Sequence, residues 1–194
     1  MTEKQTKLIV TLEELEKCYC DRTHNNVTGQ SGCLQLSKDD PRDIVIDCAI
    51  QKLYEHKVLC DDEFTLVDIF SGSSNYFSPN LLEKYSNALF VATDVINCKP
   101  YFDNTSRIKF YQIDYTDLMN VETDILSCFN VFSAMPTDAG SEFEKFLSTK
   151  RIVILDTVAP SSEPNVMFER IKTNFINCIF CGNVYHNLQS YVLF

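Results

Sequence analysis

Two patterns of apolar and polar residues alternate along most of the chain: short apolar runs and longer stretches in which apolar residues recur at helical spacing. Several short runs are nearly all apolar, as strands covered on both faces must be. These runs predict seven strands, at residues 64–70, 88–94, 107–114, 124–132, 151–158, 177–183 and 189–194. Helical spacing of apolar positions predicts helices between some of them, near residues 78–87, 138–148 and 163–174. Strands that alternate with helices indicate a parallel sheet.

The last two predicted strands need a different arrangement. Only the five residues VYHNL (184–188) separate them, which is too short a connection for a crossover helix, so these strands must form an antiparallel hairpin. The pattern therefore predicts an α/β fold with a mostly parallel seven-stranded sheet, helices on both faces and an antiparallel C-terminal hairpin. Residues 1–62 are more polar, and we interpret them as a helical N-terminal extension or cap on an α/β domain at residues 63–194.

Helix-start signals divide the N-terminal extension. A T-x-x-E capping box predicts that a first helix begins at Thr11 and continues to about Cys20. Asp40 and Pro41 then supply an N-cap and a first-turn proline for a second helix, in which apolar residues recur at helical spacing.

Length and composition indicate a cytoplasmic protein with one core. The chain has 194 residues, enough for one full hydrophobic core. No apolar run approaches the roughly 20 residues that span a bilayer, and the N-terminus lacks the apolar segment of a signal peptide. The nine cysteines agree with this interpretation, because their number is odd and several lie in apolar runs, as buried thiols do in a reducing compartment.

The charge balance restricts the class of partner. The net charge is −10, from 17 Lys plus Arg against 27 Asp plus Glu. Unaided nucleic-acid binding is disfavoured, because it depends on basic side chains that neutralise phosphates. A protein partner is compatible with this charge.

A cluster of potential metal ligands occurs near the N-terminus. Cys18, Cys20, His24 and Cys33 have the spacing C-x-C-x3-H-x8-C. Zinc knuckles usually have a C-x2-C pair, and this stretch has no second pair. We therefore expect these residues to be loop cysteines and a solvated histidine, and we expect no metal site.

Candidate ligand-binding residues follow the first three predicted strands. In open α/β sheets, ligands bind beyond the carboxyl ends of the strands. After the first strand, Gly72 and its small neighbours let the backbone approach a ligand closely. Asp94 ends the second strand 22 residues later, a spacing typical of a carboxylate that accepts from ribose hydroxyls. Asp114 ends the third strand, where it could accept from an adenine amino group while Tyr115 covers the ring.

Structural roles are the alternative for these carboxylates. Asp68 could cap the helix that follows its strand, and Asp94 could be an ordinary strand-end carboxylate. Asp117 competes with Asp114 as the N-cap of the turn after the third strand.

The order of these segments resembles that of the class I S-adenosylmethionine-dependent methyltransferases over residues 64–194. The runs DIFSGSS (68–74), TD (93–94), DYTDL (114–118) and DILSCFN (124–130) are similar to four of the family's motifs in order. The resemblance implies a Rossmann-like methyltransferase fold, S-adenosylmethionine as cofactor and methyl transfer as the reaction. It implies that the cofactor is bound by Asp68, Phe70, Ser71, Gly72, Ser73, Asp94, Val95, Asp114, Tyr115 and Asn130.

The chain departs from the family in its first motif, where Phe70 and Ser74 occupy positions that are usually glycine. The side chain of Ser74 reduces the space beside the backbone, so the alternative function is an inactive methyltransferase-like scaffold that binds a protein partner. A nicotinamide-dependent oxidoreductase is disfavoured, because the chain lacks G-x-G-x-x-G.

No catalytic signature identifies the methyl acceptor. The fourth strand does not end in N-P-P-Y, and no P-C motif for cytosine methylation occurs. The candidates for a general base are Tyr185 and His186 in the last hairpin loop and Asp156 after the fifth strand. On charge alone, we expect a small molecule or a protein as substrate.

Overall fold

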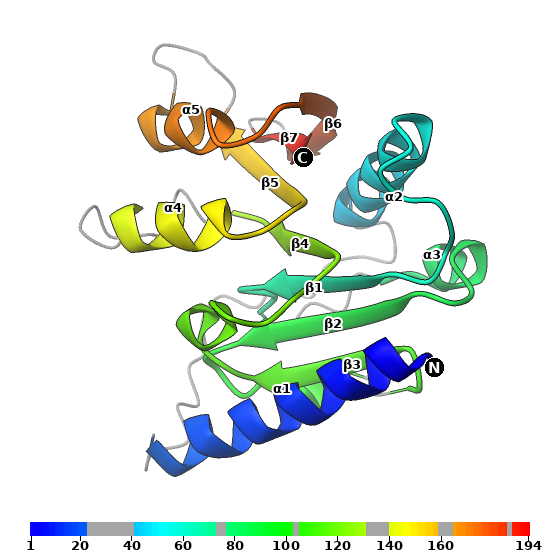
Figure 1. Ribbon diagram of the computed structural model, residues 1–194, viewed down its shortest axis with the longest axis vertical. Helices are drawn as coiled ribbons and strands as arrows, with labels where there is room; N and C mark the ends of the chain where they lie inside the picture. Colours follow the sequence, from blue (N-terminus) through cyan, green and yellow to red (C-terminus); the bar gives the residue numbers. More distant parts are fainter. Residues whose placement is uncertain (23–40, 73–76, 103–104, 131–139, 159–164, 186–187) are drawn as a thin grey trace.

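The computed structural model describes the chain except for residues 23–40, 73–76, 103–104, 131–139, 159–164 and 186–187 (Figure 1). Its helices are α1 (Glu3–Arg22), α2 (Pro41–Glu55), α3 (Pro79–Lys84), α4 (Gly140–Ser148) and α5 (Val166–Lys172), with two short 3-10 helices, η1 (Lys99–Tyr101) and η2 (Tyr115–Leu118). Its strands are β1 (Thr65–Ile69), β2 (Leu89–Asp94), β3 (Ile108–Gln112), β4 (Ile125–Cys128), β5 (Val153–Val158), β6 (Cys178–Tyr185) and β7 (Leu188–Leu193).

All seven strands belong to one sheet, in the order β3-β2-β1-β4-β5-β7-β6. The pairs among β1 to β5 are parallel, and β7 lies antiparallel between β5 and β6. The predicted strands, the parallel sheet and the antiparallel C-terminal hairpin are thus confirmed. The strand order reverses between β1 and β4, and such a topological switch point is where open α/β sheets bind ligands.

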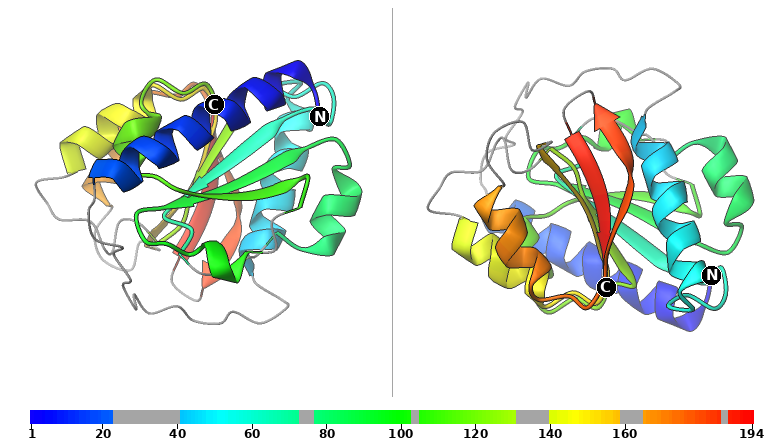
Figure 2. Two further views of the ribbon diagram at one scale, coloured as in Figure 1. Left: turned by 90° about the horizontal axis from the view of Figure 1, so that it is seen from below. Right: turned by 90° about the horizontal axis from the view of Figure 1, so that it is seen from above.

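Helices cover both faces of this sheet, as predicted (Figure 2). α2 and α3 share one hydrophobic core with Leu66 and Phe90. α1, α4 and α5 share a second core with Val67 and Val91 on the other face. Because neighbouring residues of a strand point to opposite faces and both faces are covered, the strands read as continuous apolar runs. Across the described residues, no helix is both long enough and apolar enough to cross a membrane.

The first helix is longer than the sequence predicted. α1 begins at Glu3, and the hydroxyl of Thr11 donates to the carbonyl of Lys7 at 3.0 Å inside the helix. The predicted capping box at Thr11 is therefore wrong. The physical reason is packing, since Leu8 and Leu12 lie one turn apart on a single face and are both buried against the sheet. Burial of such a face extends a helix beyond a local start signal.

The second helix agrees with its predicted start. Pro41 is the first residue of α2, and the predicted cap, Asp40, lies outside the described residues. α1 and α2 contact opposite faces of the sheet and contribute to its two cores. The division of the chain at residue 62 stays a prediction.

The cysteines have mixed environments. All those within the described residues are free thiols. Cys98, Cys128 and Cys181 are buried, as expected for small apolar residues. Cys18 and Cys20 are exposed on α1, so the expectation that they lie in a loop is wrong, because the helix continues to Arg22. Burial therefore accounts for only part of the cysteine content.

A buried lysine joins two connections that are distant in the sequence. Lys150, which follows α4, is 7% exposed, and its ammonium donates to the carbonyls of Leu118 at 2.7 Å and Val121 at 3.0 Å. The same ammonium lies 4.8 Å from the centre of the Phe146 ring. Lys150 thus fixes the turn after η2 against the start of β5.

We expect Lys150→Met to lower the free energy of unfolding by about 1–3 kcal/mol, because two buried carbonyls lose their donor. Urea unfolding at pH 7 measures this loss. Lys145→Met is the matched control, because Lys145 is exposed on α4 and its replacement should change stability by less than about 0.5 kcal/mol. Equal effects of the two substitutions would contradict the structural role of Lys150.

Candidate cofactor site

The carboxyl ends of β1, β2, β4 and β5 meet at one edge of the sheet, on either side of the switch point (Figure 1). The chain leaves β1 through Phe70, which has a left-handed φ of 58°, and Gly72, which has a φ of 62°. An ideal Cβ added to Gly72 would meet no heavy atom within 4 Å. Glycine adopts this conformation without strain, and the backbone beside it borders open space.

The ring of Phe70 is partly buried and packs against other aromatic rings. A left-handed φ is uncommon for a residue of this size. The Phe70 ring lies 5.5 Å from the ring of Tyr115 and 5.9 Å from the ring of Phe143, centre to centre. The ring is therefore packed against α4 and η2.

Asp94 binds the turn after β1 from the neighbouring strand. Its carboxylate accepts from the Gly72 N–H at 2.9 Å and from the Ile96 N–H at 3.0 Å. Gly72 and Asp94, which are 22 residues apart in the sequence, are thus in direct contact. Asp94 is 8% exposed. A carboxylate has about four acceptor positions, so two backbone donors leave capacity for further hydroxyl donors.

A second carboxylate has the equivalent position on the other side of the switch point. Asp156 is 1% exposed near the carboxyl end of β5, and its two oxygens accept from the Asn130 N–H at 2.8 and 3.0 Å. Asn130 follows β4, has a left-handed φ of 59° and has an exposed side chain. Asp156 therefore fixes the exit of β4 as Asp94 fixes the exit of β1.

Asp68 connects the two central strands. It is 1% exposed, and its carboxylate accepts from the Ser127 hydroxyl at 2.6 Å, which joins β1 to β4 at the switch point. The alternative that Asp68 caps the following helix is wrong, because Ser78 caps α3. Ser71, also buried, donates its N–H to the Thr93 carbonyl at 3.1 Å.

The turn after β3 is capped by Asp114 itself. One oxygen of Asp114 accepts from the N–H and from the hydroxyl of Thr116, both at 2.9 Å. The alternative that Asp117 is this N-cap is wrong, because Asp117 lies within η2. The ring of Tyr115 lies 5.4 Å from that of Phe143 and 5.3 Å from that of Phe146, centre to centre. The adenine contacts of Asp114 and Tyr115 stay predictions.

The last turn of α1 adds residues that the sequence analysis did not identify. The Tyr19 hydroxyl donates to the Val95 carbonyl at 3.3 Å, and Val95 follows β2. Arg22 donates to the carboxylate of Asp117. Their signal in the sequence, an aromatic and a basic residue three positions apart, is informative only if the helix continues to Arg22.

Some predicted residues lie outside the described part of the chain. They are Ser73, Ser74, His186, His24 and Cys33, together with the side chain of Tyr185. Within the described residues, no three potential metal ligands form a cluster.

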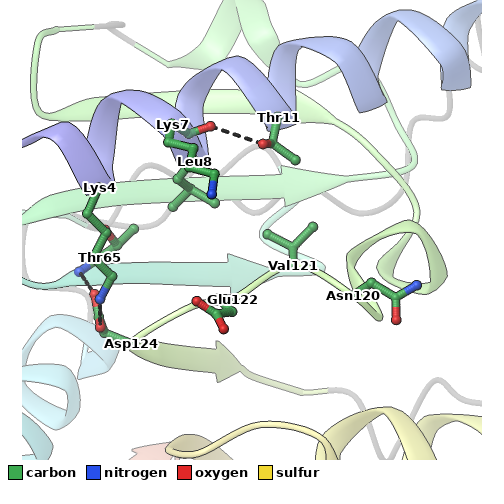
Figure 3. Close-up of a pocket in the computed structure, with 9 residues that line it drawn as sticks. All are labelled: Lys4, Lys7, Leu8, Thr11, Thr65, Asn120, Val121, Glu122 and Asp124. Atoms are coloured by element: carbon green, nitrogen blue, oxygen red, sulfur yellow. Dashed lines mark hydrogen bonds and ion pairs between the residues drawn. The ribbon is translucent and has the colours of Figure 1, made fainter.

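The opposite edge of the sheet carries a shallow pocket of about 340 Å³ beside α1 (Figure 3). Two of its charged residues contact each other, because Asp124 forms an ion pair with Lys4. Asp124 also accepts from the Thr65 N–H at 2.8 Å. This pocket lies at the amino ends of the strands, away from the switch point.

Comparison with known proteins identifies the fold. No family model and no curated protein matches the sequence. Among solved structures, the bifunctional kinase–methyltransferase WbdD is 13% identical, with a TM-score of 0.56 over 92% of this chain and 45% of that chain. Human N-acetylserotonin methyltransferase in complex with S-adenosylmethionine is 11% identical, with a TM-score of 0.53 over 98% of this chain and 66% of that chain.

A third match is the pyocyanin biosynthetic protein PhzM, 11% identical, with a TM-score of 0.50 over 76% of this chain and 54% of that chain. The chain spans about half to two thirds of the length of these structures. Two of the three are named as methyltransferases. The mostly parallel sheet with one antiparallel strand near its C-terminal end agrees with the fold that the resemblance in the sequence implies. The chain has the Rossmann-like fold of the class I S-adenosylmethionine-dependent methyltransferases.

Proposed function

We propose that this protein is an S-adenosylmethionine-dependent methyltransferase whose substrate is a small molecule or a protein. The observation that carries the proposal is the contact between the Asp94 carboxylate and the Gly72 N–H beside open space at the switch point. A left-handed glycine next to a strand-end carboxylate suits a nucleoside, because the backbone can approach it and the carboxylate can accept from its ribose hydroxyls.

The residues present fit this cofactor. In the proposed site, the turn from Phe70 to Gly72 approaches the cofactor, Asp94 accepts from the ribose, and Val95 and Asp114 border the adenine. Asn130 lies at the β4 exit, the side of the crevice where the resemblance expects the methyl donor. The cofactor would supply an electrophilic methyl group on a sulfonium, and the protein's task is to align the nucleophile behind it and exclude water.

Asp156 acts in this proposal by positioning Asn130. Burial raises the pKa of Asp156 to about 6, and the N–H of Asn130 and the positive charge of Arg42 oppose that rise. Its oxygens already accept from the Asn130 N–H and it is 1% exposed, which supports a positioning role over direct contact with a methyl acceptor. Tyr185 and His186 stay predictions for a general base.

The alternative function, an inactive scaffold that binds a protein partner, has one observation in its favour. Both oxygens of Asp94 already accept backbone N–H groups, so the turn after β1 is stabilised by the protein alone. If the fold needs this contact for its own stability, Asp94 would be retained even in a protein that has lost cofactor binding during evolution. Cofactor binding therefore distinguishes the two functions.

The first prediction from the proposed function concerns thermal stability. S-adenosylmethionine or S-adenosylhomocysteine at a hundredfold excess over its Kd should stabilise the protein by about 2.7 kcal/mol. This corresponds to a rise in Tm of about 5–10 °C for a domain of this size. In Asp94→Ala, the rise should be lost because the ribose loses its acceptor. Differential scanning fluorimetry measures both.

Asp124→Ala is the matched control for this experiment. Asp124 also accepts a backbone N–H, from Thr65 at 2.8 Å, but at the opposite edge of the sheet. Its replacement should lower the Tm of the free protein and leave the cofactor-induced rise unchanged. The absence of any rise in the wild type at millimolar cofactor would contradict the enzyme and favour the scaffold.

The second prediction concerns pH. Because the pKa of Asp156 is raised to about 6 in the folded state, the folded protein binds more protons than the unfolded chain between about pH 4 and 6. The contribution of Asp156 to the free energy of unfolding therefore decreases as the pH rises through this range. Relative to Asp156→Asn, the wild type should lose about 1 kcal/mol between pH 5 and pH 7. Urea unfolding at pH 5, 6 and 7 measures the difference, and parallel pH profiles would refute the raised pKa.

A further inference from the structure

The C-terminal end of α1 lies beside the strand exits that form the nucleoside side of the proposed site (Figure 1). Glu16 accepts from the Gln112 N–H at 2.7 Å, at the end of β3. One turn further, the Tyr19 hydroxyl donates to the Val95 carbonyl at 3.3 Å, and the Gln112 side chain donates to the same carbonyl at 2.9 Å. The end of α1 is therefore attached to the exits of both β2 and β3.

An ion pair completes this attachment. One guanidinium nitrogen of Arg22 donates to both oxygens of Asp117, at 2.9 and 2.8 Å. The Arg22 side chain is 60% exposed and that of Asp117 is 15% exposed. The same guanidinium lies 5.9 Å from the centre of the Tyr19 ring. Arg22 thus connects the last residue of α1 to η2 and contacts the ring of Tyr19.

Tyr19 lies among three carboxylates. Burial raises the pKa of its hydroxyl, and the negative charges of Asp114, Asp117 and Asp94 raise that pKa further. Two of these carboxylates, Asp94 and Asp114, are the ones assigned to the nucleoside in the proposed function. Arg22 places a positive charge beside one of these carboxylates, Asp117, and a cation in the last turn of a helix is also favourable for the helix dipole.

We propose that Tyr19, Arg22 and Asp117 form a clasp, the α1 clasp, which makes the end of α1 one wall of the site for an adenine nucleoside. Tyr19 and Arg22 are positioning residues in this proposal. Tyr19 fixes the Val95 carbonyl, and Arg22 keeps the last turn of α1 from fraying away from η2. The inference rests on the proposed function, because it assigns a role to residues around the same cofactor.

The test measures the affinity for two probes by titration calorimetry. S-adenosylhomocysteine carries the nucleoside and the amino-acid half, whereas 5′-methylthioadenosine carries the nucleoside without the amino acid. We expect Arg22→Met to weaken both by the same factor, about two- to fivefold, the range that corresponds to a partly exposed ion pair. Asp117→Ala should have the same effect, and the double variant should lose no more than either single variant, because all three remove one contact.

Two further variants separate positioning from general stability. Arg22→Lys should retain the affinity within about twofold, because a single nitrogen makes the contact and lysine keeps the charge. Arg170→Met is the matched control, since Arg170 forms an ion pair with Glu144 at 2.9 Å and is similarly exposed, at 56%, away from the site. It should leave both affinities unchanged. The Tm of free Arg22→Met should equal that of free Arg170→Met within about 2 °C.

The outcomes separate the clasp from the proposed function. If Arg22→Met and the wild type have equal affinities for both probes, the clasp is overturned, and the proposed methyltransferase function is unaffected. A loss for S-adenosylhomocysteine alone would also overturn the clasp, because it would place Arg22 at the amino-acid end. No saturable binding of either probe or of S-adenosylmethionine by the wild type would overturn the proposed function and the clasp with it.

Discussion

The candidate site depends on one contact that occurs twice. In each case a buried carboxylate accepts the N–H of a residue with a left-handed φ, which follows the neighbouring strand on the side of the switch point. Asp94 of β2 binds Gly72 after β1, and Asp156 of β5 binds Asn130 after β4. These two contacts flank the switch point symmetrically. Since each contact fixes the direction in which the chain leaves its strand, the geometry of the switch point depends on both carboxylates.

The energetics of the two contacts differ because their surroundings differ. Asp156 is almost fully buried and its raised pKa shows that burial outweighs the favourable effect of the Asn130 N–H and of Arg42. Asp94 accepts from two N–H groups and remains 8% exposed. A carboxylate that is partly accessible and already hydrogen-bonded is held in place before a ligand arrives. Pre-organisation of this kind reduces the entropic cost of binding.

The sequence predicted the sheet well, because a strand that is buried on both faces needs apolar residues at consecutive positions. Several strands are nearly continuous apolar runs, and the short connection at residues 184–188 required a hairpin. The start of α1 was not predicted, because the local capping signal at Thr11 is weaker than the burial of Leu8 and Leu12 against the sheet. Local signals decide a boundary only where tertiary packing does not act on it.

The site was predicted in part for the same reason. The contact between Gly72 and Asp94 has a recognisable spacing, because the crossover between adjacent parallel strands has a characteristic length. The contact between Asp156 and Asn130 has no such signature, and neither has the pair of Arg22 and Asp117, which are 95 positions apart.

Several acidic residues of the chain lie near the carboxyl ends of β2 and β3, close to the end of α1. Burial raises the pKa of the Tyr19 hydroxyl, and the negative charges of Asp114, Asp117 and Asp94 raise it further. Arg22, on a helix far from these carboxylates in sequence, forms an ion pair with Asp117. The net charge of −10 disfavoured unaided nucleic-acid binding but did not reveal this arrangement, because a net charge does not say where in the fold the charges lie.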